Sequence, residues 1–87
     1  MFSKKNLTRK ERAELAAKLE RRLEVHFYKT VTTYYNITGN RQTALGQMAS
    51  EYLTKRRVYP TRGTQIDNAY AKAKERFANY KKMIKVA

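Results

Sequence analysis

The C-terminal third of the chain carries the pattern that most constrains the fold. Its apolar side chains alternate at spacings of four and three residues through five steps: Ile66, Tyr70, Ala73, Phe77, Tyr80 and Ile84. Residues with these spacings share one face of an α-helix, so the pattern predicts a helix over about residues 64–85 that packs on other helices. Thr64 is expected to cap it, with Asp67 completing a weak capping box.

A longer amphipathic helix is expected at the other end, over about residues 8–35. Thr8 and Glu11 have the spacing of a capping box. Apolar residues then recur every fourth position: Leu15, Leu19, Leu23, Phe27 and Val31. The stretch "HFYKTVTTYYNIT" is rich in residues that favour strands, but Phe27, Val31 and Tyr34 continue the same apolar face, so helix is preferred.

A third helix is expected between these two, over about residues 41–57. Apolar residues at spacings of three and four define its inner face: Leu45, Met48, Ala49, Tyr52 and Leu53. Gly39 suits the left-handed cap position that ends the preceding helix. Gly46 lies inside the helix, where glycine is unfavourable, and is interpreted as a close contact between helices.

The sequence therefore predicts an all-α fold, a small three-helix bundle with a long first helix. Its 87 residues are enough for one domain, with residues 1–7 as a basic flexible arm and residues 8–87 as a single helical domain. A homodimer is kept as an alternative, because the apolar face of the last helix could also pair two chains. The absence of cysteine excludes disulfides and thiolate zinc sites.

Charge points to the class of partner. Twenty lysines and arginines against seven acids give a formal charge of +13, which is usually retained because the partner is anionic. Nucleic acid is preferred over an acidic protein or an anionic membrane surface. The excess is +4 in each of residues 1–12, 41–63 and 64–87, and only +1 in residues 13–40. Within residues 13–40, Lys18, Arg21 and Arg22 are interpreted as ordinary helix-surface partners of Glu20 and Glu24.

The stretch "LTKRRVYPTRGTQ", residues 53–65, is the strongest candidate for a phosphate-binding surface. Cations at the end of a helix complement its dipole, but that does not account for three consecutive cations followed by Arg62. Tyr59 offers a ring for stacking on a base, and Pro60 restricts the loop. The start of the next helix, near Thr64 and Gln65, presents free backbone N–H groups to a phosphate.

One resemblance suggests a geometry for binding. "YYNITGNRQTALGQMA" and "RGTQ" resemble parts of the helix-turn-helix in the factor-for-inversion-stimulation family. The distance between Gly39-Asn40 and Arg62-Gly63 is longer than that family's tight turn, so membership is not inferred. The resemblance implies the last helix in a major groove, with four residues on its outer side: Gln65, Asn68, Lys72 and Arg76.

Enzymatic chemistry has little support in the sequence. His26 is the single histidine and has no second ligand within helical reach, so no metal site is expected, and it is interpreted as a residue at the edge of the core. No phosphate-cradling glycine loop, nucleophile motif or paired carboxylates occur. No cofactor is expected.

The sequence thus predicts a non-enzymatic nucleic-acid-binding protein of the cytoplasm or nucleoid, most simply a DNA-binding regulator. The expected contact residues are Arg41, Lys55, Arg56, Arg57, Tyr59, Arg62, Gln65, Lys72 and Arg76. Of these, Arg41, Lys55, Arg56, Arg57 and Arg62 are expected to share one face, while Lys4, Lys5, Arg9 and Lys10 add non-specific affinity. Outward-facing Tyr28 and Tyr59 would favour RNA or single strands. The alternative is a small basic adaptor or inhibitor, of phage or plasmid type, that binds an acidic host protein.

Overall fold

The computed structural model describes residues 8–80. The predicted basic arm and the end of the helix predicted over residues 64–85 lie outside this range. The helices are α1 (Arg9–Thr38), α2 (Arg41–Val58), the short 3-10 helix η2 (Pro60–Arg62) and α3 (Gly63–Ala78). The described residues contain no strand, and the prediction of an all-α three-helix bundle is confirmed.

Helix α1 begins with the predicted capping box. The Thr8 hydroxyl accepts a hydrogen bond of 3.1 Å from the backbone N–H of Glu11, whose carboxylate accepts one of 2.9 Å from the backbone of Thr8. At the other end the helix runs three residues past the expected boundary, to Thr38, and Gly39 closes it with the left-handed φ of 71° that its sequence position predicted. The β-branched second half is helical because Phe27 and Val31 are buried against the other helices.

The start of α3 differs from the prediction. Pro60, which favours the first position of a helix, starts η2, and the chain passes from η2 into α3 at Gly63. The backbone is therefore already helical at Thr64, and the residue before the helix, Arg62, makes no side-chain cap. The predicted capping box of Thr64 and Asp67 is wrong, because Asp67 instead accepts hydrogen bonds from α2.

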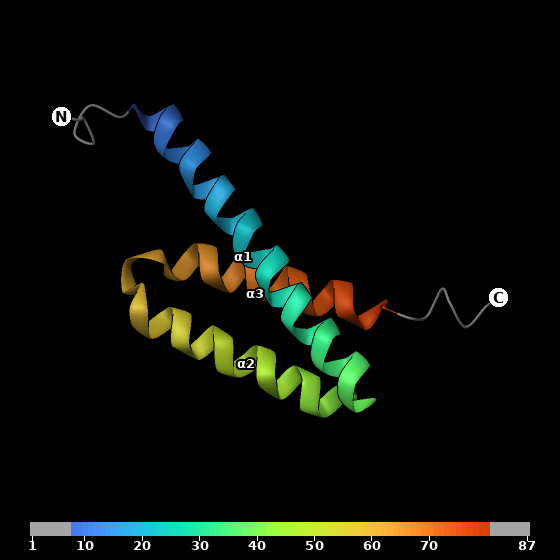
Figure 1. Ribbon diagram of the computed structural model, residues 1–87. Helices are drawn as coiled ribbons and strands as arrows, with labels where there is room; N and C mark the ends of the chain where they lie inside the picture. The colour runs from blue at the N-terminus through green and yellow to red at the C-terminus, as the bar shows by residue number, and fades with distance from the viewer. Residues whose placement is uncertain (1–7, 81–87) are drawn as a thin grey trace.

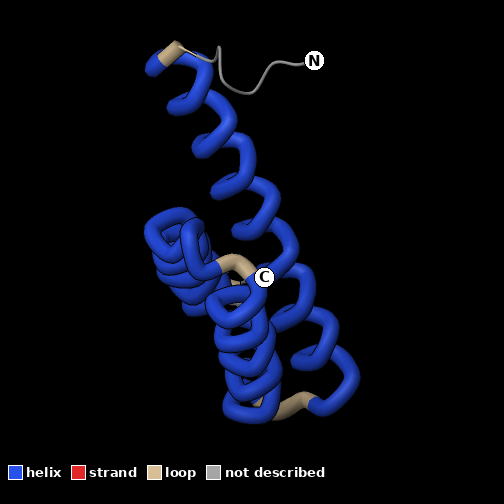
Figure 2. The backbone as a smooth tube through the Cα atoms, turned by 90° about the vertical axis from the view of Figure 1, so that its left-hand side faces the viewer, coloured by secondary structure: helices blue, strands red, loops and turns tan. Residues whose placement is uncertain are grey.

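The three helices pack so that α1 lies against both α2 and α3 (Figure 1). The view in Figure 2 shows the N-terminal part of α1 extending past the other two helices. We call residues 9–22 the protruding segment; Glu20 near its end contacts α3. The arrangement leaves one end of a long amphipathic helix uncovered.

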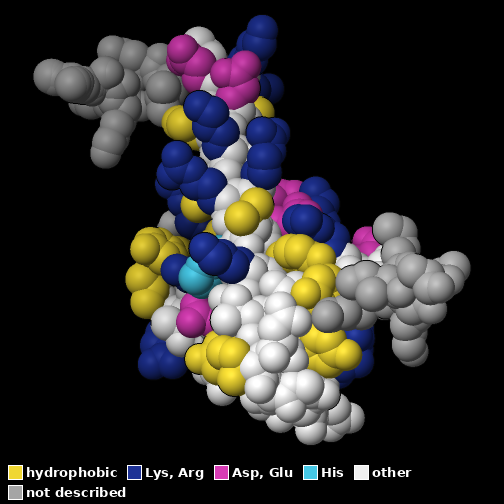
Figure 3. Space-filling model, turned by 45° about the vertical axis from the view of Figure 1, so that its right-hand side comes forward, with side chains coloured by type: hydrophobic (Ala, Val, Ile, Leu, Met, Phe, Trp, Pro, Cys, Tyr) yellow, Lys and Arg dark blue, Asp and Glu magenta, His cyan; other side chains and the backbone are white. Residues whose placement is uncertain are grey.

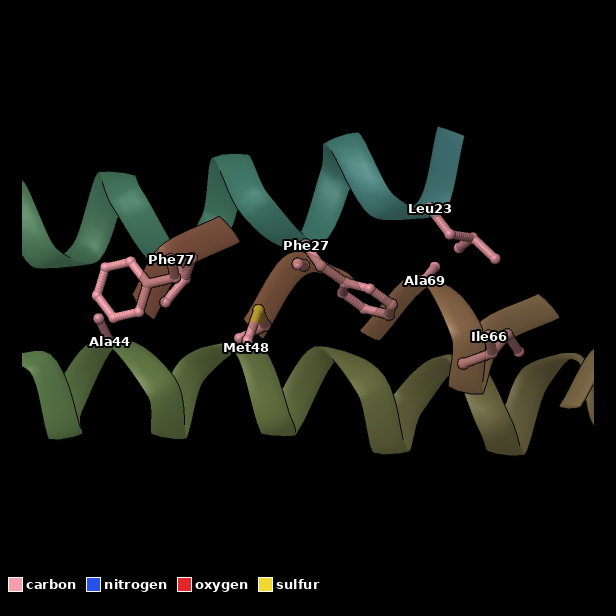
Figure 4. Close-up of a cluster of buried hydrophobic side chains, with 9 residues drawn as sticks. Leu23, Phe27, Ala44, Met48, Ile66, Ala69 and Phe77 are labelled. Carbon is pink, nitrogen blue, oxygen red and sulfur yellow. The ribbon is translucent and has the colours of Figure 1, made fainter. Parts of the chain in front are cut away.

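The core forms where all three helices meet, in the region drawn in Figure 4. Its buried residues are Leu23, Phe27, Val31, Ala44, Met48, Ile66, Ala69, Ala73 and Phe77. Over the described residues, the apolar face of α3 is covered by α1 and α2 of the same chain. Ile84 lies outside the described residues, and the pairing of two chains stays a prediction. Among the described residues, no helix combines the length and apolar composition needed to cross a membrane.

Aromatic rings extend the core towards the C-terminal end of α3. Tyr35 packs edge-on against Phe77, with ring centroids 5.6 Å apart, and Tyr28 packs edge-on against Tyr80 at 6.1 Å. Tyr28 is half-buried, which corrects the expectation that it faces outward. Gly46 is exposed and a Cβ atom there would meet nothing within 4 Å, so the close helix contact predicted at this position is also wrong.

Candidate nucleic-acid interface

The connection between α2 and α3 presents four of the predicted contact residues together. We call them the basic corner: Lys55, Arg57, Tyr59 and Arg62. The backbone N–H of Tyr59 donates to the carbonyl of Lys55 (2.8 Å), and that of Arg62 donates to the carbonyl of Tyr59 (3.0 Å). The Tyr59 side chain is half exposed, with the Lys55 ammonium 5.9 Å from its ring. Arg57 and Arg62 are exposed and form no ion pair within residues 8–80.

The side chain of Arg56, between Lys55 and Arg57, binds Asp67 of α3. Its Nη1 donates to both carboxylate oxygens of Asp67, at 2.8 and 2.9 Å, and the Tyr52 hydroxyl donates to the same carboxylate at 2.6 Å. The hydrogen bond from Tyr52, helped by Arg56, lowers the pKa of Asp67. The same hydrogen bond raises the pKa of Tyr52. Arg56 therefore joins α2 to α3, and its charge is matched internally.

Arg41 lies at the opposite end of α2 from the basic corner. Lys55 is fourteen positions further along the helix, which is a distance of about 21 Å along the axis. Its Nη2 donates a 2.6 Å hydrogen bond to the carbonyl of Phe77. The expectation that Arg41 shares a face with Lys55, Arg56, Arg57 and Arg62 is wrong.

The predicted outer row of α3 lies beside α1. The Lys72 ammonium is 2.8 Å from the Glu20 carboxylate, and Arg76 is 3.2 Å from that of Glu24. Asn68 donates to Glu20 at 3.3 Å. The hydrogen bond between Lys72 and Glu20 raises the pKa of Lys72 and lowers that of Glu20. These three side chains hold the helices together, which contradicts the geometry of an α3 free to enter a major groove.

Gln65 and His26 are the two remaining residues for which the sequence made a prediction. Gln65 is half-buried in the first turn of α3, next to the basic corner. His26 lies 2.9 Å from the Glu51 carboxylate of α2. Its ring centroid is 6.0 Å from that of the core residue Phe27, which agrees with its interpretation as a residue at the edge of the core. Within residues 8–80, no group of three or more metal-ligating side chains occurs.

The protruding segment is a basic surface of which only Arg9 and Lys10, at its start, were expected from the sequence to contribute to binding. Six lysines and arginines lie on it, all exposed and none in an ion pair within the described range: Arg9, Lys10, Arg12, Lys18, Arg21 and Arg22. Figure 3 shows basic side chains along both sides of this segment, with acidic ones near its free end. Because Glu20 and Glu24 bind α3 instead of their neighbours on α1, this surface could not be found from local charge spacing.

The described residues as a whole carry fifteen lysines and arginines against seven acids. The ion pairs between helices use three of those cations, Arg56, Lys72 and Arg76. The cations outside these pairs include those of the basic corner and of the protruding segment. A scan of protein-family models and searches of the curated proteins and the solved structures find no match to this chain.

Proposed function

We propose that this chain binds DNA through its phosphates, using the basic corner and the protruding segment. The observation that carries the proposal is the position of the exposed cations that lie outside every ion pair of the described residues. Arg57 and Arg62 gather at the α2–α3 connection, and six more cations gather on a helix segment of fourteen residues. That segment is about 21 Å long, which is sufficient to reach several successive phosphates of one strand.

Duplex DNA is favoured over single strands and RNA by the position of one tyrosine. Stacking on unpaired bases needs exposed aromatic rings. Tyr28 is half-buried beneath the Arg76 guanidinium, which lies 4.0 Å from its ring centroid. Of the two rings for which stacking was predicted, only Tyr59 is exposed. Tyr34 is 38% exposed but lies outside the basic corner and the protruding segment. A regulatory role on DNA without catalysis is the corresponding biological proposal, and RNA binding is the second candidate.

Salt dependence tests the proposal directly. Labelled duplex DNA, single-stranded DNA and RNA of equal length are titrated with the full chain at several salt concentrations, with fluorescence anisotropy as the readout. If the surface neutralises about five phosphates of duplex DNA, the logarithm of affinity falls with the logarithm of salt concentration with a slope near −4.5. A chain that binds none of the three at low salt would overturn the proposal.

A further inference from the structure

A groove runs between the protruding segment and the α2–α3 connection. Its volume is about 350 Å³, and the residues that line it are Leu15, Leu19, Leu23, Tyr59, Arg62 and Ile66. Three leucines of α1 and one isoleucine of α3 make the floor apolar. Arg62 is the single charged residue of the lining. The groove therefore combines an apolar floor with one positive charge.

The floor continues the apolar stripe of α1 beyond the part that the fold covers. Leu23, Phe27 and Val31 are buried by α2 and α3, but Leu15, in the same fourfold spacing, is 51% exposed. A stripe with helical spacing is normally buried along its whole length. In this chain the uncovered end of the stripe forms one wall of the groove.

Basic side chains flank the groove, although one acid, Glu11, also lies four residues before Leu15. Besides Arg62, Arg12 lies three residues before Leu15 and Arg22 three residues after Leu19. Helical residues three apart are neighbours on the surface, so these arginines flank the leucines. Arg12 and Arg22 are exposed and form no ion pair within residues 8–80.

We infer that this groove binds an amphipathic, acidic helix of a partner protein. Apolar side chains of that helix, at spacings of three and four, would pack on the leucines of α1, and acidic side chains at its edges would pair with Arg62, Arg12 and Arg22. This is the helix-in-groove mode of peptide recognition. The inference does not rest on the proposed DNA binding. The two proposals share Arg62, Arg12 and Arg22, but only the proposed DNA binding also uses Arg57 and the other cations of the protruding segment.

A second copy of this chain is a poor occupant on grounds of charge. Each of its helices carries more lysines and arginines than acids: seven against four in α1, four against one in α2 and three against two in α3. The sequences "MFSKKNL" and "KKMIKVA" at the two ends contain lysines and no acid. Duplex DNA offers phosphates to the flanking arginines but nothing to cover the leucines.

The test uses three synthetic helical peptides of about sixteen residues, long enough for four turns. The first contains leucines at spacings of three and four among glutamates and alanines. The second has the same composition with the leucines dispersed around the helix, and the third has lysine in place of every glutamate. Binding to the ¹⁵N-labelled full chain is followed by anisotropy and by shifts of the backbone amide resonances.

Matched variants locate the contact. Leu15→Gln removes a half-exposed leucine of the groove, and Leu53→Gln removes one of similar exposure, 59%, on α2 outside it. Arg62→Glu reverses the charge in the groove, and Lys29→Glu makes the same change at an exposed position elsewhere on α1. Because these side chains are exposed, all four variants are expected to keep the thermal midpoint of the wild type within a few degrees.

The expected result is saturable binding of the first peptide alone, with amide shifts at Leu15, Leu19 and Ile66. Leu15→Gln and Arg62→Glu weaken it about tenfold, which corresponds to 1.4 kcal/mol, and the two control variants change it less than twofold. Equal binding of the dispersed peptide, or no saturation at about 1 mM, overturns the inference. So does a dimer in sedimentation equilibrium that Leu15→Gln dissociates.

Discussion

The guanidinium of Arg41 both covers the ring of Phe77, at 4.2 Å from the centroid, and donates a 2.6 Å hydrogen bond to the carbonyl of that residue. It also lies 5.3 Å from the ring centroid of Tyr35 on α1. One side chain from the start of α2 thus connects the end of α3 to α1. The Phe77 carbonyl, in the last turn of α3, also accepts a hydrogen bond of 2.9 Å from the backbone N–H of Tyr80, so the Arg41 guanidinium adds a second donor to it.

Arg41→Ala is therefore expected to lower the free energy of unfolding by about 1–3 kcal/mol, through loss of the hydrogen bond and of the cation–π contacts. Arg41→Lys should recover little of this, because an ammonium group lacks the flat, forked geometry. Urea unfolding followed by circular dichroism measures both. Arg57→Ala is the control and should stay within about 0.5 kcal/mol of the wild type; equal losses at the two positions would refute the assignment.

The DNA proposal predicts that removing Arg57 and Arg62 together weakens duplex binding and makes the salt slope shallower by about two. The thermal midpoint should be unchanged, since neither side chain forms an ion pair within residues 8–80. The matched control is the double substitution of Lys29 and Lys74 by alanine, which removes the same charge from other exposed positions. If the control loses as much affinity, only net charge matters and the basic corner has no special role.

Acid should destabilise the protein through Asp67 and Glu20. The pKa of each is lower in the folded protein than its ordinary value. The folded state therefore binds fewer protons than the unfolded chain, whose carboxylates have a pKa of about 4. Their contribution to stability is complete above that pKa and is lost as the pH falls through the lowered folded pKa.

Urea midpoints measured between pH 2 and pH 6 would test this (a range of about two units on either side of 4). Asp67→Asn should be less stable than the wild type at the upper end and should show a smaller change with pH. Glu75→Gln removes an exposed carboxylate that forms no ion pair within the described residues. The urea midpoint of Glu75→Gln should change with pH as that of the wild type does. If its change with pH were as small as that of Asp67→Asn, the result would count against the ion pair between Asp67 and Arg56.

Two glycines should respond in opposite directions to alanine. Gly39 has a φ of 71°, a conformation that costs alanine about 1–2 kcal/mol. Gly46 is exposed within α2 and has free space around it, so alanine there should stabilise the protein by up to about 1 kcal/mol. Thermal melts of the two variants give the comparison. A loss of stability at Gly46 would mean that the glycine serves a contact absent from the isolated chain.

The caps of α1 could be predicted from the sequence because local interactions decide them, whereas the β-branched second half of α1 is helical because Phe27 and Val31 are buried by the other helices. The capping box at Thr8 and Glu11 depends on groups three residues apart, and the cap at Gly39 depends on one backbone torsion. The exception is the start of α3. There Pro60 initiates a 3-10 turn, and Asp67 binds Arg56 and Tyr52 of α2 in place of the expected capping role.

By itself, therefore, the sequence determined three amphipathic helices, their approximate limits and a large positive charge, since these follow from composition and from spacings of three and four. Only the tertiary structure decided which cations remain available to a partner. The ion pairs of Lys72 with Glu20 and of Arg76 with Glu24 join residues 52 positions apart. Such pairs depend on how the helices cross, and no local pattern of charges contains that information.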